Sequence, residues 1–458
     1  MKRNDFRYVE MAGLLRTEIM SGYLQPGQYL LPETELCRKY AISRNSLRQA
    51  LDLLTEEGLL VRQRGRGNRV ADRVRPDGYG PNTLVLLSPY RSSFAEEGLP
   101  LLVSAFRRDY PDVDVKLLYT GYLADTIMRD LTGFGVKPDL VLAWDRHFIE
   151  FDRREFVPLT RIVPDEADVP GKLLQAFRKQ DELYAAPVTY SPVFLACNPA
   201  LFEAAGVHMP ALEWSMEQFA EAAKRLTRDE GGGMLRETYG FGLSGSLIRW
   251  PVLAMNFGYR RETEDGRSGL DRLEEALGFM QRLLYRDRVC PVSAVGDWLF
   301  LNELFEDGRL AMLLTTTLAT PMRRRPFPLR VLPLPRQPGV TSGSLAIANG
   351  LMVSRSASNP ELARRFIEYA VRHDFQRRMS QQTGFLSIYD SVNRDVWSAY
   401  ERSVLGIDRE RMDRSCFIHD LFPVFFKPQE LEGRMKPFWA GLESPRHLVA
   451  SLFADRNG

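Results

Sequence analysis

A charged stretch at residues 72–82, interrupted by two prolines and two glycines, divides the 458-residue chain into two segments with different patterns. Such a stretch is typical of an exposed linker, because it has few apolar side chains to bury. A chain of this length is also too long for a single hydrophobic core. We therefore expect a small domain at residues 1–72, a linker at 73–82 and a larger unit at 83–458.

The small domain has the element order of a winged helix-turn-helix. Apolar residues recur at helical spacing in three stretches, and two short apolar strands follow. Ser43 is placed to cap the third helix and Gly58 to end it. A glycine on each side of Arg66 tolerates the positive φ that a hairpin tip needs. We expect helices at 8–21, 33–40 and 44–57, and strands at 59–61 and 70–71.

Basic and amide side chains concentrate on two parts of this domain. From Arg62 to Arg75 six arginines face one acid, Asp72, although the whole chain has a net charge of only +2. Basic and amide side chains at the start of a recognition helix, here the helix expected at 44–57, can read base edges in the major groove. Arginines of the wing can lie along phosphates. The residues expected at DNA are Arg44, Asn45, Ser46, Arg48, Gln49, Arg64, Gly65, Arg66, Gly67 and Arg69.

Several motifs of this domain resemble the DNA-binding domain of the GntR family of bacterial regulators. They lie at residues 21–27, 33–36, 42–51, 57–59 and 65–67. The resemblance implies that Arg44, Arg48, Gly65 and Gly67 lie at double-stranded DNA, and that a homodimer binds a palindromic operator. Residues 31–34 read Leu-Pro-Glu-Thr where the family usually has Pro-Ser-Glu-Arg. A backbone-contacting arginine is therefore missing, and we expect the operator affinity to differ accordingly.

The larger unit begins with alternating apolar strands and amphipathic helices. We expect strands at 83–87, 113–119 and 140–143, with helices near 100–110 and 123–131. This alternation predicts βαβ units and a mostly parallel sheet. Because ligands lie beyond the carboxyl ends of parallel strands, the candidate binding residues are Ser88, Tyr90, Trp144, Asp145 and Arg146.

Motifs along the larger unit follow a recognisable order. They lie at residues 183–188, 195–198, 201–207, 214–227, 305–312, 349–353 and 358–363. Their order resembles the sugar-type extracellular solute-binding proteins of ABC importers, the maltose-binding kind. The resemblance implies an α/β, periplasmic-binding-protein-like (type II) fold of two lobes. We expect lobe 1 at about 83–189 and 348–387, and lobe 2 at about 193–342 and 390–458.

The resemblance also implies a ligand site between the lobes. Sugars present apolar faces and many hydroxyls, so their sites combine aromatic rings with planar polar groups. The matching positions in the first lobe are Trp144, Asp145 and Arg146. The others are Tyr190, Arg249, Trp250, and Thr315 and Thr316 in the loop that also includes Thr317. We interpret the late aromatic residues as core packing, namely Phe422, Phe425, Phe426, Phe438 and Trp439.

The composition indicates a cytoplasmic protein. The N-terminus has no apolar signal segment, and no run of 18 apolar residues is present to cross a membrane. The four cysteines lie far apart, as expected of reduced thiols. No H-E-x-x-H, G-x-S-x-G or P-loop motif occurs, and the five histidines lack metal-ligand spacing. We therefore expect no enzyme activity, cofactor or metal.

Two alternatives remain open beside a carbohydrate-responsive transcription regulator. A GntR-type head can precede a body that resembles pyridoxal-phosphate aminotransferases, but that chemistry needs a lysine in the large domain. No lysine lies between Lys224 and Lys427, and the absorbance of an internal aldimine would decide the question. In the second alternative the larger unit only dimerises, and no solute would raise its melting temperature.

Overall fold

A computed structural model describes most of the chain. It covers residues 4–20, 24, 26–40, 42–63, 65–72, 82–89, 92–120, 137–210, 213–229, 237–260, 269–320, 327–341, 344–422 and 427–453. Arg64, Tyr90, Phe425, Phe426 and the helix expected at 123–131 lie outside these residues. Within them, no helix combines the length and the apolarity needed to cross a membrane.

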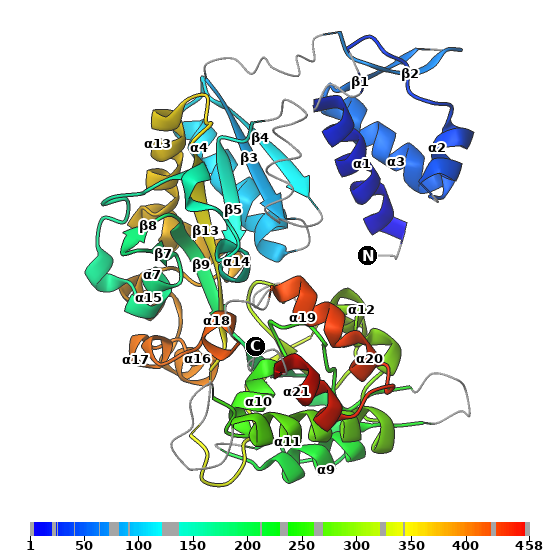
Figure 1. Ribbon diagram of the computed structural model, residues 1–458, viewed down its shortest axis with the longest axis vertical. Coiled ribbons are helices and arrows are strands. Elements are labelled where there is room, and N and C mark those ends of the chain that lie inside the picture. The colour runs from blue at the N-terminus through cyan, green and yellow to red at the C-terminus, as the bar shows by residue number, and fades with distance from the viewer. Residues whose placement is uncertain are drawn as a thin grey trace.

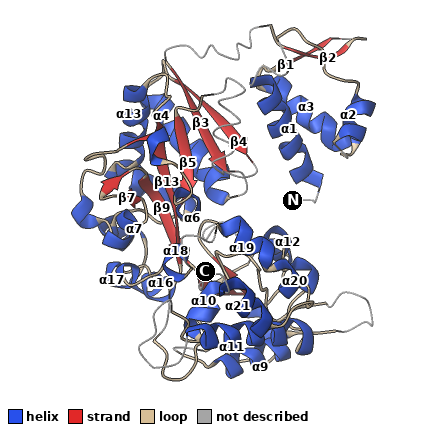
Figure 2. Ribbon diagram, in the orientation of Figure 1, coloured by secondary structure: helices blue, strands red, loops and turns tan. Residues whose placement is uncertain are grey.

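The N-terminal elements form a head with a two-stranded wing (Figures 1 and 2). They are α1 (Asn4–Met20), α2 (Glu33–Lys39), α3 (Arg44–Glu56), β1 (Leu60–Gln63) and β2 (Gly67–Val70). The Ser43 hydroxyl caps α3 by accepting the backbone N–H of Ser46 at 3.1 Å. Gly58, Gly65 and Gly67 have φ angles of 72°, 80° and 98°. The predicted winged helix-turn-helix is confirmed.

The first lobe is built on a six-stranded sheet in the order β4-β3-β5-β13-β6, with β9 also paired to β13. Its strands are β3 (Thr83–Pro89), β4 (Asp114–Thr120), β5 (Leu140–Trp144), β6 (Phe156–Val157), β9 (Ala186–Pro192) and β13 (Ala346–Ser354). β3 is parallel to β4 and β5, but β13 is antiparallel to β5, β6 and β9. The prediction of a mostly parallel sheet is wrong for β13, because this strand returns from the second lobe without a helical crossover.

Short and long helices surround this sheet (Figure 2). They are η1 (Phe94–Gly98), α4 (Leu99–Asp109), α6 (Asp145–Phe148), η2 (Arg153–Glu155), η3 (Glu166–Asp168), α7 (Gly171–Gln175), α13 (Pro360–Ala370) and α14 (His373–Thr383). A small hairpin, β7 (Arg178–Lys179) and β8 (Glu182–Leu183), lies before β9. Phe106 of α4 contacts Phe366 and Tyr369 of α13 edge-on, so the two helices share one apolar layer.

The second lobe has a three-stranded antiparallel sheet in the order β11-β10-β12. Its strands are β10 (Phe194–Cys197), β11 (Met312–Thr315) and β12 (Arg330–Leu332). Its helices are α8 (Pro199–Ala204), α9 (Met216–Leu226), α10 (Pro251–Asn256), α11 (Gly269–Gln281), η4 (Arg282–Arg286), η5 (Val292–Ala294), α12 (Trp298–Glu306), α19 (Pro428–Arg434), α20 (Lys436–Trp439) and α21 (Pro445–Phe453). The expected two-lobed α/β fold is therefore present.

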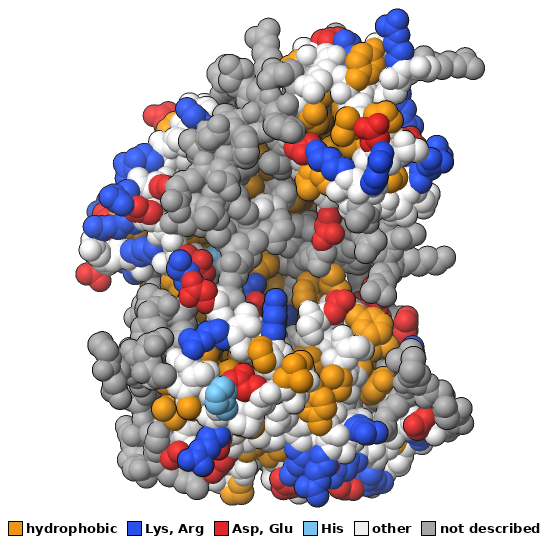
Figure 3. All heavy atoms as spheres, turned by 45° about the vertical axis from the view of Figure 1, so that its right-hand side comes forward, with side chains coloured by type: hydrophobic (Ala, Val, Ile, Leu, Met, Phe, Trp, Pro, Cys, Tyr) orange, Lys and Arg blue, Asp and Glu red, His pale blue; other side chains and the backbone are white. Residues whose placement is uncertain are grey.

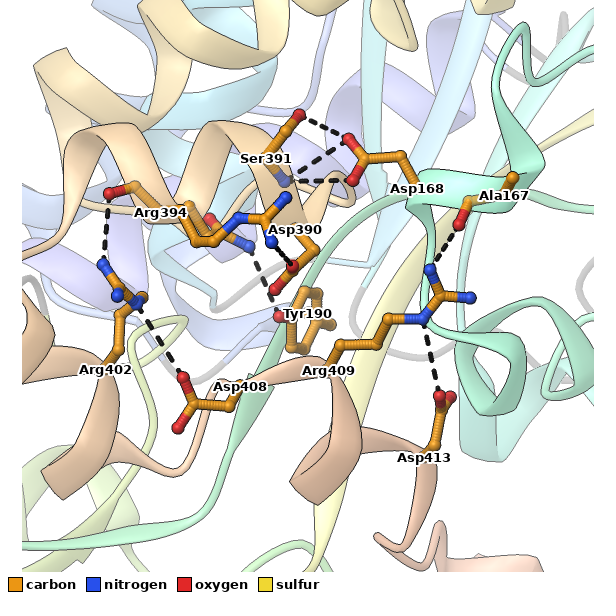
Figure 4. Close-up of polar contacts among 11 residues, drawn as sticks. Ala167, Asp168, Tyr190, Asp390, Ser391, Arg394, Arg402, Asp408, Arg409 and Asp413 are labelled. Carbon is orange, nitrogen blue, oxygen red and sulfur yellow. Dashed lines mark hydrogen bonds and ion pairs between the residues drawn. The ribbon is translucent and has the colours of Figure 1, made fainter.

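The lobes are joined where β9 continues into β10 and the chain returns into β13. The backbone N–H of Val193 donates to Leu345 O at 2.7 Å at this crossing. The connection back to α19 forms α15 (Asp390–Val396), α16 (Ala399–Leu405), α17 (Arg409–Asp413) and α18 (Ile418–Leu421). Figure 4 shows polar contacts that tie α15 and α17 to the first lobe: Ser391 to Asp168, and Arg409 to the Ala167 carbonyl.

The head is docked on the first lobe, with α1 against β4 (Figure 1). A Cβ atom at Gly13 of α1 would lie 3.6 Å from the carbonyl oxygen of Tyr119 in β4. Beside this contact Arg16 is only 8% exposed, and its Nε donates to Glu57 of the head at 2.8 Å. One hydrophobic cluster contains Leu15 of the head and Val115 of the lobe, so the two parts pack together.

Candidate ligand-binding cleft and nucleic-acid interface

A cleft of about 840 Å³ lies between the two lobes. Its first-lobe wall comes from the residues after β3 and β5 and from β13, and α19 and α20 contribute to its second-lobe wall. Its lining residues are Ser92, Trp144, Asp145, Arg146, Ser244, Gly245, Ser246, Ile248, Arg249, Val292, Val295, Gly296, Trp298, Thr316, Leu318, Ala319, Ile347, Ala348, Asn349, Glu432, Lys436, Trp439 and Ala440. This volume suits a solute of a few rings.

Five of the residues selected from the sequence meet in this cleft: Trp144, Asp145, Arg146, Arg249 and Thr316. Trp144 is the last residue of β5, and Asp145 and Arg146 follow it directly, where the rule for strand ends places a ligand. After β3 the same rule selected Ser88 and Tyr90, whereas the residue that lines the cleft there is Ser92.

Arg146 connects the two lobes across the cleft. Its guanidinium lies 4.8 Å from the centre of the Trp144 ring, a cation–π contact within the first lobe. Its Nη1 donates to Glu432 Oε1 of α19 at 3.3 Å. Glu432 also accepts the backbone N–H of Leu247 at 3.2 Å, so its carboxylate is held in place. Sequence reasoning missed Glu432 because no motif surrounds it.

Four buried polar atoms in the cleft have no hydrogen-bond partner among the residues described. They are Asp145 Oδ2, Arg146 Nε, Asn349 Nδ2 and Trp439 Nε1. Buried polar groups are nearly always hydrogen-bonded, so these atoms indicate where the polar groups of a ligand would be satisfied. Trp439 packs against the second-lobe core, as predicted, and it also lines the cleft. A Cβ at Gly245 would lie 2.9 Å from its indole nitrogen.

Asp145 is a buried carboxyl group with one satisfied oxygen. Its Oδ1 accepts the backbone N–H of Ala348 at 2.8 Å, and its side chain is almost inaccessible to solvent. Burial raises its pKa to about 7, partly opposed by the Ala348 hydrogen bond and by the charge of Arg146. The carboxyl group is therefore partly protonated near neutral pH.

This pKa predicts a pH dependence of stability that Asp145→Asn removes. Between about pH 4 and pH 7 the folded state binds a proton that the unfolded state has lost, so the wild type loses stability as the pH rises, by up to about 4 kcal/mol. Denaturant unfolding of both proteins at pH 5 and pH 8 measures the difference. Parallel changes in the two proteins would contradict the raised pKa.

Arg249 is a buried arginine in the second-lobe wall. It is 5% exposed, and it donates to Ile248 O at 2.9 Å and to Thr316 Oγ1 at 3.4 Å. Burial and the nearby charge of Arg146 lower its pKa to about 9. Both effects disfavour the charged guanidinium, which neighbouring anions normally stabilise.

The other residues selected for the ligand site do not line the cleft. Trp250 is buried in the second-lobe core, edge-on to Phe422 and Trp439. Tyr190 of β9 is buried, and its hydroxyl accepts from Asn393 Nδ2 at 3.3 Å (Figure 4). The remaining buried residues have internal partners: Ser88 donates to Pro89 O, Thr315 bonds Thr320, and the Thr317 N–H donates to Ser191. Tyr90 lies outside the described residues.

In the part of the chain that the structure describes, one group of possible metal ligands lies apart from the cleft lining. Asp165, Asp168 and His373 bring ligand atoms within 4.8 Å of one another. Asp168 accepts from the backbone and hydroxyl of Ser391, and the His373 ring stacks on Tyr389 at 3.7 Å. Because Asp168 and His373 already have partners within the protein, their positions need no metal ion to explain them. We assign no metal to the group.

The head exposes most of the side chains selected for DNA. Arg44, Asn45 and Arg48 are exposed along the first turns of α3, and Gln49 is half-buried. Ser46 is fully buried and bonded to Ser43 at 2.9 Å, so the expectation that it reaches DNA is not met. Ser46 lies three residues after the cap Ser43, so its side chain is on the face of α3 that contacts Ser43.

The wing presents the second part of the candidate interface. Gly65, Arg66 and Gly67 are exposed at its tip, and Arg69 is paired with Asp72. Arg64 lies outside the described residues. Figure 3 shows basic side chains on the head with acidic side chains interspersed among them. The basic side chains are the ones that suit contact with a phosphate backbone.

Two protein families match this chain. Residues 92–377, more than half of it, match the family of bacterial extracellular solute-binding proteins, and residues 7–70 match the gntR family of bacterial regulatory proteins. GntR regulators bind DNA, and neither family is a family of enzymes.

Individual relatives cover the two parts separately. A protein of Brucella abortus named as a binding protein is 26% identical over 307 residues, which are 62% of this chain and 71% of the relative. The HTH-type transcriptional repressor NagR of Bacillus subtilis is 44% identical over 64 residues, which are 14% of this chain and 26% of NagR.

A solved structure of the same fold is the ABC substrate-binding protein of Listeria monocytogenes, determined in complex with cycloalternan. It is 17% identical, with a TM-score of 0.67 over 82% of this chain and 98% of the other. At this identity the likeness concerns the fold alone. The chain therefore belongs to the family of bacterial extracellular solute-binding proteins, and it carries the DNA-binding domain of GntR regulators at its N-terminus.

Proposed function

We propose that this protein is a cytoplasmic transcription regulator in which a small solute, a carbohydrate, binds between the lobes and alters DNA binding by the head. The docking of α1 on β4 supports this proposal most directly, because a head fixed to one lobe can follow the position of that lobe. Trp144, Trp298 and Trp439 in the cleft offer the aromatic surfaces that sugar rings use.

A chain of contacts leads from the cleft to the head. The backbone N–H of Ser93 donates to Leu318 O of the second lobe at 3.0 Å, beside the lining residue Ser92. The Ser92 hydroxyl accepts from Ala95 N at 3.1 Å, and the Tyr119 hydroxyl donates to Ala95 O at 3.1 Å. Tyr119 in turn lies against Gly13 of the head. Closure of the lobes would therefore act on η1 and, through Tyr119, on α1.

Closure can change DNA affinity only as far as the solute prefers one arrangement of the lobes. We propose that a homodimer places two heads on a palindromic operator and that closure changes their spacing. The proposed divisions are the head at 1–72, the linker at 73–82 and the two lobes within 83–458.

Thermal-shift measurements with a panel of sugars test whether a sugar binds this protein, since a ligand of the folded state raises its Tm.

Arg48 is expected to carry part of the operator affinity. Its side chain is 57% exposed on α3 and pairs only with Glu33, at 3.0 Å, among the described ion pairs. Replacing Arg48 by Ala should weaken operator binding by about 1–3 kcal/mol, measured by fluorescence anisotropy. Arg66→Ala at the wing tip should instead lower the slope of log affinity against log salt by about 1.

Arg414→Ala serves as the control, because this arginine is 70% exposed and lies outside the head. Its operator affinity and salt slope should equal those of the wild type. Equal affinities for the wild type, Arg48→Ala and Arg66→Ala would remove α3 and the wing from the proposed interface.

A further inference from the structure

Arg249 is a buried cation in the cleft wall, and a second cation, Arg146, lies near it. The guanidinium of Arg249 is buried in the cleft wall and, among the described residues, donates to the neutral oxygens of Ile248 and Thr316. No carboxylate in the described part of the chain lies within 4.0 Å of it. Buried charges in proteins are normally paired, because an isolated one loses its hydration without compensation. An anionic group of a ligand would supply such a partner.

A second arginine, Arg146, increases the excess of positive charge in the cleft. The nearby charge of Arg146 lowers the pKa of Arg249, as burial also does. The cleft lining includes three cations, Arg146, Arg249 and the exposed Lys436, against two acids, Asp145 and Glu432. Glu432 already pairs with Arg146 at 3.3 Å, and burial raises the pKa of Asp145 to about 7. Neither acid compensates the charge of Arg249.

We propose that the solute is an acidic sugar derivative whose carboxylate or phosphate group binds Arg249 and Arg146 together. The proposal rests on the proposed function and names the chemical class of its ligand. Arginine presents planar paired donors that match both oxyanions, and the free Nε of Arg146 adds a further donor in the cleft. The sugar ring would lie against tryptophan, with its hydroxyls at Asp145 and Asn349.

The two arginines also explain how such a ligand would favour closure. Arg146 belongs to the first lobe and Arg249 to the second, so closure without an anion between them would bring like charges closer together. An anion between them converts this repulsion into two charge-assisted hydrogen-bonding contacts. The acidic group is thus the part of the ligand that distinguishes the closed arrangement from the open one.

Matched pairs of neutral and acidic ligands test this proposal on the full chain. Calorimetry compares glucose with glucuronate, galactose with galacturonate, and glucose with glucose 6-phosphate. At least one acid should bind tenfold or more tightly than its neutral partner, and the acid that does so identifies a carboxylate or a phosphate. In Arg249→Gln that preference should disappear, while Arg249→Lys should keep part of it. Arg286→Gln, at an exposed position of the second lobe, should bind like the wild type.

Three other results would contradict the proposal of an acidic ligand. Neutral sugars that bind as tightly as their acidic partners would overturn the acidic class and leave the proposed carbohydrate sensor standing. An acid preference that survives in both Arg249 variants would remove Arg249 from the site. No binding by any of the five compounds in these three comparisons, with DNA binding intact, would overturn both this inference and the proposed carbohydrate function.

Discussion

Replacement of Gly13 by leucine is expected to abolish the effect of a bound solute on DNA binding, while DNA binding itself persists. A Cβ at this position already lies in van der Waals contact with the Tyr119 carbonyl, so the longer leucine side chain must push α1 away from β4. Leucine favours a helix by almost 1 kcal/mol over glycine, and the head should remain folded. Operator titrations with and without solute should then differ by less than about twofold, against about fivefold or more in the wild type.

Leu14→Phe is the matched control for this variant. Leu14 is 42% exposed on the same helix, so added bulk there meets solvent and not β4. The control should respond to the solute like the wild type, and all three proteins should bind operator equally well without it. A Gly13→Leu protein that keeps the full response would show that the head does not communicate through this contact.

Gly240→Ala is expected to destabilise the second lobe by about 3 kcal/mol or more. An added Cβ would lie 1.9 Å from the backbone carbonyl oxygen of Ala223 at the end of α9, and backbone atoms cannot turn away. The core of this side of the lobe is a separate cluster that includes Ala223 and Phe241 but no head residue. Solute binding should be lost or strongly weakened, whereas operator binding by the head should persist.

Calorimetric unfolding and operator titration measure these two effects on the same protein. Gly433→Ala is the control, since a Cβ in this exposed turn of α19 meets no atom within 4 Å. It should raise stability slightly, because alanine restricts the unfolded chain more than glycine does. Loss of operator binding in Gly240→Ala, in step with the loss of solute binding, would contradict the separation of the head from the second-lobe core.

Local chemistry explains which features could be predicted from the sequence. Ser43 as a cap and the wing glycines depend on neighbours within a few residues, and the structure places them as expected. Trp144 to Arg146 lie at the carboxyl end of the buried strand β5, so their place at the cleft is explained by a general property of sheets. Helical spacing likewise gave the limits of α2 and α3 to within a residue.

The remaining features depend on contacts between distant parts of the chain. Glu432, Lys436 and Trp439 enter the cleft from helices that follow the last crossing, and no local pattern marks them. The direction of β13 is set by its return from the second lobe. The contact of Gly13 with Tyr119 joins two domains across a linker, so periodicity in either domain carries no information on it.

The most direct test of the central claim is the operator affinity of the wild-type chain with and without a saturating cleft ligand, at one salt concentration. A duplex selected by the protein from a random library serves as the operator, and the ligand is the tightest-binding sugar found by calorimetry. The account predicts a change in operator Kd of about fivefold or more when the cleft is occupied. Identical Kd values, with calorimetry showing an occupied cleft in the same sample, would contradict it.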